Sequence, residues 1–239
     1  MCGRYATTRN TAQLREIFKV GADYVDEVPR QDYNMAPTKK APIVLCVGAP
    51  DGDPDAAARQ LRLAVWGQRP KWIKDVKKRG LTNARAESVD EKPSFRTAFA
   101  QRRCIVPADG FYEWFTESPD DGGKPVKQPY FFRPADGAVL AMAGLLDWWH
   151  DPESDLWTPT YSIITTSATD DAGMVHDRMP MIVTADRWEA WLDPAVTDPI
   201  EARSLMTAPL NGVLDIYPVS KAVGSVRNNG PQLVESIAV

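Results

Sequence analysis

Short apolar and β-branched runs recur along this chain, and proline, glycine or aspartate bounds each of them. The runs are Ile43–Val47, Leu61–Trp66, Cys104–Val106, Tyr130–Phe132, Val139–Leu146, Tyr161–Thr166, Met181–Thr184 and Leu214–Val219. Runs of this length between turn residues are typical of β-strands. Their recurrence therefore predicts a many-stranded sheet as the centre of the fold.

Helical patterns are fewer and irregularly placed. Residues 12–19 carry Leu14, Ile17 and Phe18 at helical spacing, with Thr11 as the expected cap. Further helical patterns cover Ser94–Gln101, Asp186–Leu192 and Ile200–Met206. This irregular placement does not fit a regular βαβ series. We therefore expect an α+β fold in a single domain over residues 1–239, with a curved, barrel-like, mainly antiparallel or mixed sheet and peripheral helices.

Two segments, 48–58 and 117–127, are rich in glycine, proline and aspartate and lack apolar periodicity. Strand-like runs flank both segments closely, so we interpret them as surface loops and not as domain linkers.

Composition limits where the protein works and what it binds. No apolar run approaches the ~20 residues needed to span a bilayer, and no secretory signal precedes the first motif. The three cysteines are odd in number and lack metal-ligand spacing, which favours a reducing cytoplasm. The sequence implies no metal or organic cofactor. The net charge of −4 argues against coating nucleic acid through bulk charge. Any DNA contact must therefore use a local basic groove.

Cys2 is the first candidate for chemistry. Removal of Met1 would leave a 1,2-aminothiol, whose α-amine has a reference pKa of ~7.7–8.0 against ~10.4 for lysine. An aldehyde would form an imine with this amine, and the adjacent thiol could close a five-membered thiazolidine. The alternative is an inert, partly buried thiol.

The chain also carries a series of short motifs. These are CGRY at Cys2–Tyr5, YNMAPT at Tyr33–Thr38, WG at Trp66–Gly67, NARAE at Asn83–Glu87, RRCIVPADGFYEW at Arg102–Trp114, HDRMP at His176–Pro180 and YPVS at Tyr217–Ser220. In this order they resemble the SOS response-associated peptidase (SRAP) family. The resemblance implies a DNA-damage protein that crosslinks covalently to abasic sites in single-stranded DNA through its N-terminal cysteine. The family was first proposed to be a cysteine peptidase that processes its own N-terminus.

The resemblance makes Cys2 the nucleophile and adds Asn83, Glu113 and His176 to the site. Opening the sugar, dehydrating the carbinolamine and reversing the link all need proton transfers, for which a carboxyl and an imidazole are suited. Glu113 lies between Phe111 and Phe115 on one face of a strand-like run, so it is either a perturbed catalytic carboxyl or an exposed edge residue. His176 alone would fit a surface loop.

DNA binding is expected from basic and aromatic groups within or beside these motifs. The expected residues are Arg4, Arg85, Arg96 and Arg178 for phosphate contacts, Trp66 and Trp72 for stacking or wedging, and Pro37 and Gly67 for backbone shape near the lesion. The alternative for Trp66 is core packing, and for Asn83 and Arg85 a polar strand edge. We expect a monomer near the nucleoid, and the sequence indicates no particular replication partner.

The chain departs from the family pattern at two places. Gln68-Arg69 follow the WG motif where the family often has an apolar residue, so we expect the edge of the DNA groove to differ. Val223-Gly224 replace a frequent Val-Asn pair, which removes an amide that could support the site.

Three hypotheses from different classes remain open. The first is the covalent abasic-site sensor. The second is an N-terminal-nucleophile hydrolase acting on peptide or amide bonds, including self-removal of Met1. Glutamine amidotransferases of that class also begin Met-Cys-Gly, but neither histidine here is followed by Asn-Gly. The third is a non-catalytic single-strand or junction-binding module in which Cys2 is incidental.

Overall fold

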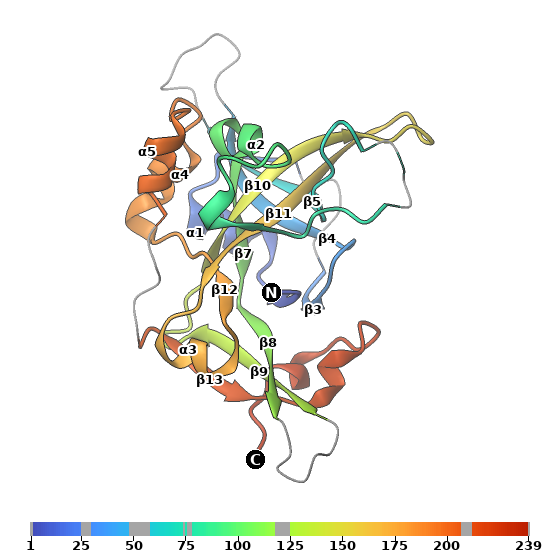
Figure 1. Ribbon diagram of the computed structural model, residues 1–239, viewed down its shortest axis with the longest axis vertical. Coiled ribbons are helices and arrows are strands. Elements are labelled where there is room, and N and C mark those ends of the chain that lie inside the picture. The colour runs from blue at the N-terminus through green and yellow to red at the C-terminus, as the bar shows by residue number, and fades with distance from the viewer. Residues whose placement is uncertain are drawn as a thin grey trace.

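The computed structural model describes most of the chain, namely residues 2–24, 30–47, 58–73, 75, 78–117, 125–206 and 212–238. Two β-sheets dominate these residues, and short helices lie around them (Figure 1). The expected α+β class is confirmed.

The first sheet is antiparallel and holds the start of the chain. Its strand order is β13 (Leu214–Pro218), β9 (Val126–Pro134), β8 (Gly110–Glu117), β1 (Arg4–Thr7) and β3 (Asp32–Met35). Strand β1 therefore pairs with β8 on one side and with β3 on the other. This pairing fixes the N-terminal residues inside the sheet and brings them next to β8.

The second sheet is mixed and closes on itself. Its order is β12 (Arg178–Pro180), β11 (Trp157–Ser167), β10 (Leu140–His150), β7 (Arg103–Ala108), β4 (Lys40–Val47), β5 (Ala58–Trp66) and β2 (Ala22–Tyr24). Strands β5 and β11 lie near opposite ends of this order, and a parallel pairing between them closes the sheet. The expected barrel-like core is therefore confirmed. The short strand β6 (Asn83–Arg85) also pairs with β11 in parallel.

Short helices and 3₁₀ turns pack against both sheets. They are α1 (Thr11–Phe18), α2 (Arg96–Gln101), α3 (Asp170–Val175), α4 (Trp188–Leu192) and α5 (Pro199–Ser204), with 3₁₀ turns η2 (Ala86–Ser88), η3 (Ala185–Arg187), η4 (Lys221–Gly224) and η5 (Pro231–Leu233). In the part of the chain that the structure describes, no helix combines the length and apolarity needed to cross a membrane.

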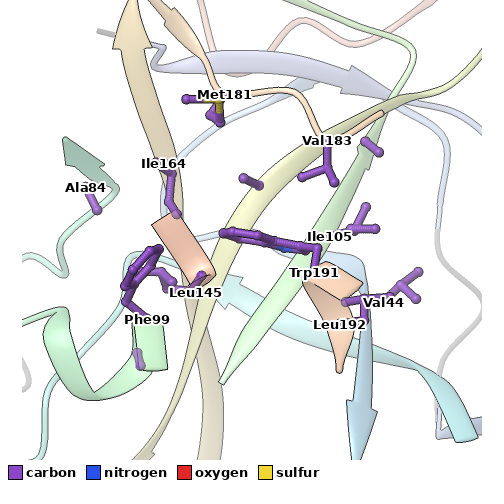
Figure 2. Close-up of a cluster of buried hydrophobic side chains, with 14 of the residues drawn as sticks. Val44, Ala84, Phe99, Ile105, Leu145, Ile164, Met181, Val183, Trp191 and Leu192 are labelled. Carbon is purple, nitrogen blue, oxygen red and sulfur yellow. The ribbon is translucent and has the colours of Figure 1, made fainter. Parts of the chain in front are cut away.

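Buried aromatic and aliphatic side chains fill the space between the second sheet and helices α1, α2, α4 and α5. Figure 2 shows Trp191 near the centre of this cluster, with Phe99 on one side and Val44 on the other. Trp191 has no solvent exposure, and its Nε1 donates to the Cys104 carbonyl 2.9 Å away. Helix α4 is therefore anchored to β7 by both packing and a satisfied polar group.

Several predicted elements need correction. Asn10, and not Thr11, caps α1, because its side chain accepts from the Gln13 backbone and Gln13 returns the bond in a capping box. The run Met181–Thr184 is not a strand, because β12 ends at Pro180 and only an isolated bridge at Ile182 follows. Strands β1, β2 and β3 and helix α3 carry too weak a periodicity to be predicted.

The two predicted loops lie mostly outside the described residues. Where the described residues resume, β5 begins at Ala58 and β9 begins at Val126, so the end of the second predicted loop is already strand.

Close backbone packing makes one glycine hard to replace. A Cβ added at Gly80 would overlap the Gly67 carbonyl oxygen, while Gly67 itself has a φ of +125° that favours glycine. We expect Gly80→Ala to lower the free energy of unfolding by about 1–3 kcal/mol, measured by urea denaturation. Gly224→Ala is the matched control, since a Cβ there meets no atom within 4 Å. Equal stability of the two variants would contradict this packing.

Candidate active site

Strand pairing brings Cys2 close to Glu113. Arg4 of β1 lies opposite Tyr112 of β8, so the residue two before Arg4 lies beside the strand positions after Tyr112. Cys2 has no solvent exposure and Glu113 is 3% exposed. The first sheet thus holds a thiol and a carboxyl together in its interior.

The environment of Cys2 keeps its thiol protonated. Burial raises the pKa of the Cys2 thiol far above its usual range, and the negative charge of Glu113 raises it further. The only hydrogen bond of Cys2 Sγ within the described residues is a long one, 3.8 Å to the Arg4 carbonyl. The thiol therefore needs a base before it can act as a nucleophile.

The Glu113 carboxyl is poised to exchange protons near neutral pH. Burial raises its pKa to about 7, against the opposing effect of the positive charge at the start of the chain. Its Oε2 lies 3.9 Å from His176 Nε2. A carboxyl with a pKa near the working pH is suited to act as either acid or base.

The hydrogen bonds of His176 define which nitrogen faces Glu113. The Arg178 backbone N–H donates to His176 Nδ1 over 3.0 Å, so the neutral ring carries its proton on Nε2, toward Glu113. Asp177 Oδ1 also lies 2.9 Å from Nδ1, but its side chain is 86% exposed. Burial lowers the pKa of His176, and the positive charge at the chain start lowers it further. This direction favours the neutral imidazole over the protonated one.

Asn83 presents an amide donor. It belongs to β6 and lies opposite Ile163 of β11. Thr82 Oγ1 donates to its Oδ1 over 3.2 Å, whereas its Nδ2 is buried and has no acceptor among the residues that the structure describes. A buried amide nitrogen without an acceptor is costly, and a bound oxygen atom would satisfy it.

Trp66 is part of the core. Its side chain has no exposure and packs between Tyr5 and Tyr161, while its Nε1 donates to the Thr82 carbonyl over 2.9 Å. It therefore cannot stack on a base in this conformation, and it instead supports the segment that carries Asn83.

Pro37 and Gly67 lie close to each other in the fold. The backbone N–H of Thr38 donates to the Trp66 carbonyl over 2.8 Å, which holds the turn after Pro37 against the end of β5. Pro37 is half-buried, and Gly67 continues from Trp66. Of the two predicted tryptophans only Trp72, at 58% exposure, presents its ring to solvent.

The four predicted arginines divide into two pairs. Arg4 and Arg178 make hydrogen bonds within the protein: Arg4 Nη1 donates to Asn34 Oδ1 and to the Val223 carbonyl, and Arg178 binds Glu87 with both terminal nitrogens. The side chains of Arg85 and Arg96 are exposed, and neither side chain makes a hydrogen bond or salt bridge with the described part of the chain.

Sequence reasoning assigned no role to Glu87 or Asn34. Glu87 is visible within the NARAE motif, but its pairing with Arg178 joins residues far apart in the chain. Asn34 Nδ2 donates to three carbonyls of the segment after β13, those of Val223, Ser225 and Asn228. Asn34 thus anchors this segment to β3, although Gly224 follows Val223 where the family often has asparagine.

Comparison with known proteins places the chain in a family. The model of the family described as SOS response associated peptidase (SRAP) matches residues 1–226. A protein of Bacillus subtilis (strain 168) named abasic site processing protein YoqW is 35% identical over 238 residues, which cover 99% of this chain and 100% of the relative.

A vertebrate relative and a solved structure are also similar. Abasic site processing protein HMCES of Gallus gallus is 32% identical over 274 residues, covering 99% of this chain and 78% of that protein. The crystal structure of a Bacteroides thetaiotaomicron protein superimposes with a TM-score of 0.79 at 25% identity, covering 99% of this chain and 100% of the other.

Proposed function

Because the chain belongs to the SOS response associated peptidase family, we propose that it processes abasic sites in single-stranded DNA through a covalent bond to Cys2. The observation that carries this proposal is the group formed by the buried Cys2 thiol, the Glu113 carboxyl with its pKa raised to about 7, and the neutral His176 imidazole. The names of the full-length relatives support the choice of substrate.

Capture begins at the Cys2 nitrogen. This nitrogen is an amide while Met1 precedes it, so Met1 must first be removed. The free α-amine then attacks the C1′ aldehyde of the opened sugar, and loss of one water gives an imine. The Cys2 sulfur adds to the imine carbon while its proton goes to the nitrogen, which closes a thiazolidine ring without a further leaving group.

Glu113 is proposed to move the protons in these steps. Opening the sugar requires a proton to leave the C1′ hydroxyl and one to reach the ring oxygen, and dehydration requires protonation of the departing hydroxyl. With its pKa near 7, Glu113 is populated in both forms at neutral pH, so it can both accept and donate. It can also take the Cys2 proton.

His176 and Asn83 are proposed to orient the reaction. The Nε2–H of His176 faces Glu113 and can hand over a proton or hold the carboxylate in place. The buried Asn83 Nδ2 is suited to donate to a sugar or carbinolamine oxygen.

A thiazolidine has a chemical advantage over a lysine imine at this lesion. An imine withdraws electrons and promotes β-elimination of the 3′ phosphate, whereas the ring-closed adduct has no C=N bond. The aminothiol at the chain start therefore suits protection of the lesion.

A second candidate activity is peptide-bond hydrolysis by Cys2, limited to removal of Met1. The same grouping of thiol, carboxyl and imidazole favours it, because an acyl-transfer nucleophile also needs a base. Intact-mass analysis tests it: loss of Met1 should persist in cells that lack methionine aminopeptidase activity and should require Glu113. Retention of Met1 there would contradict self-removal.

Arg85 is proposed to contact a phosphate of single-stranded DNA. It is exposed and lies two residues after Asn83 on β6. We expect Arg85→Ala to weaken binding of an undamaged single strand several-fold and to reduce the salt slope by about 0.7, measured by fluorescence anisotropy between 50 and 200 mM salt. Arg133→Ala, on the half-exposed pair with Asp215, is the matched control. Equal effects of the two changes would contradict a DNA contact by Arg85.

A further inference from the structure

Glu87 occupies the hydrogen-bonding edge of Arg178. Arg178 Nη1 lies 2.5 Å from Glu87 Oε1, and Arg178 Nη2 lies 3.0 Å from Glu87 Oε2. A guanidinium binds a carboxylate and a phosphate with the same two-pronged geometry. The carboxylate of Glu87 therefore takes the position that a phosphate would need in order to bind this arginine.

The two members of the pair differ in how firmly they are held. Arg178 Nη2 also donates to the Thr165 carbonyl over 2.7 Å, and the Arg178 side chain is only 13% exposed. The Glu87 side chain is 52% exposed, and Arg178 is the only side chain of the described residues that donates to it. The hydrogen bonds from Arg178 also hold the pKa of the Glu87 carboxyl below its usual value. An anchored cation thus faces a carboxylate that can rotate into solvent.

The pair lies at the edge of the candidate active site. Thr165 of β11 pairs with Arg85 of β6 on one side and with Pro180 of β12 on the other. Glu87 follows β6, which carries Asn83, and Arg178 begins β12, directly after the His176 segment. The salt bridge therefore connects the two segments that carry these site residues across the end of β11.

We propose that Glu87 is a specificity-determining residue that occupies the phosphate position at Arg178 until a backbone phosphodiester of single-stranded DNA displaces it. This inference rests on the proposed function. A strand that binds only through its phosphates must compete with Glu87. A strand captured at Cys2 presents its neighbouring phosphate at high effective concentration and displaces the carboxylate readily. Glu87 would therefore disfavour binding of intact strands.

The test compares Glu87→Gln with Glu189→Gln, which changes the net charge equally on an exposed residue of α4. Glutamine at this position keeps the side-chain length and one acceptor oxygen, so the fold is preserved. We expect E87Q to bind an undamaged single strand about tenfold more tightly at 50 mM salt, with a salt slope steeper by about 0.7. The E189Q variant should bind like wild type in both respects.

A double-mutant cycle with Arg178→Gln completes the test. If the effect acts through Arg178, E87Q should change affinity little in the R178Q background. Unchanged affinity of E87Q, or an equal gain in both backgrounds, would overturn the inference. If E87Q slowed covalent capture and left DNA affinity unchanged, the inference would also be overturned. Glu87 would then stabilise the structure of the site through its salt bridge with Arg178. Wild-type capture on a denaturing gel is scored separately, since its absence would instead contradict the proposed function.

Discussion

Cys2→Ala is expected to abolish the adduct that survives denaturation when the protein meets a single strand carrying one abasic site. Alanine keeps an α-amine at the chain start once Met1 is removed, but it has no sulfur to close the ring. Only a hydrolysable imine can then form. Wild type should give a shifted band on a denaturing gel without reductant, and the variant should give none.

Borohydride supplies the control for this prediction. It reduces an imine to a stable amine, so it should restore a shifted band for Cys2→Ala and should change little for wild type. Intact mass of each protein reports whether Met1 is present, which separates loss of the thiol from a blocked amine. A stable band from Cys2→Ala without borohydride would show that another residue captures the lesion.

Glu113→Gln is expected to slow capture by roughly 10²–10⁴-fold, the usual contribution of a positioned general acid or base. Glutamine fills the same buried space beside His176 but cannot exchange a proton. The rate should be followed by quenched denaturing gels at saturating DNA. Dissociation constants for an uncleavable abasic-site analogue should match wild type. A variant that reacts at the wild-type rate would exclude Glu113 from proton transfer.

The pH dependence of the capture rate tests independently whether Glu113 transfers protons. With a pKa of about 7, Glu113 is mostly protonated below neutrality and mostly ionised above it. Wild-type rates should therefore show an inflection near pH 7 that is missing from the Glu113→Gln profile, while ionisation of the α-amine affects both proteins.

The raised pKa of Glu113 also predicts how folding stability depends on pH, and it predicts that Glu113→Gln lowers activity without lowering stability at alkaline pH. The pKa of Glu113 is raised from 4.5 when unfolded to about 7 when folded, so the folded state binds the proton more tightly. Folding stability is then greatest below pH 4.5 for this group and falls as the pH rises toward 7. Glu113→Gln should be at least as stable as wild type at pH 8, which rules out unfolding as the reason for lost activity.

The sheet was predictable because its long strands carry clear apolar runs. The predicted runs Val139–Leu146 and Tyr161–Thr166 fall on β10 and β11, except that β10 begins one residue later, and these two strands pair along most of their length. The strands β1 and β3 were not predictable, because RYAT and DYNM mix charged, polar and apolar residues. Tertiary pairing defines these strands, and local sequence does not: β1 pairs with β8, and β3 pairs with β1.

The motif series predicted which residues form the candidate site but not their geometry. It predicted Cys2, Glu113 and His176 as site residues, and the pairing of β1 with β8 brings the first two together. Trp66 illustrates the limit: its position after an apolar run fitted both stacking and core packing, and its burial follows from Tyr5 and Tyr161, which are remote in sequence. Likewise, no local sequence pattern indicated that Arg178 pairs with Glu87.

The most direct test of the central proposal is the intact mass of the wild-type adduct, formed without reductant and isolated under denaturing conditions. Covalent capture by the Cys2 aminothiol predicts the mass of the protein without Met1 plus that of the DNA strand, less one water. Peptide mapping should place the DNA on Cys2. A denatured mixture that contains only free protein lacking Met1 and free DNA would contradict the account, as would an adduct mapped to any other residue.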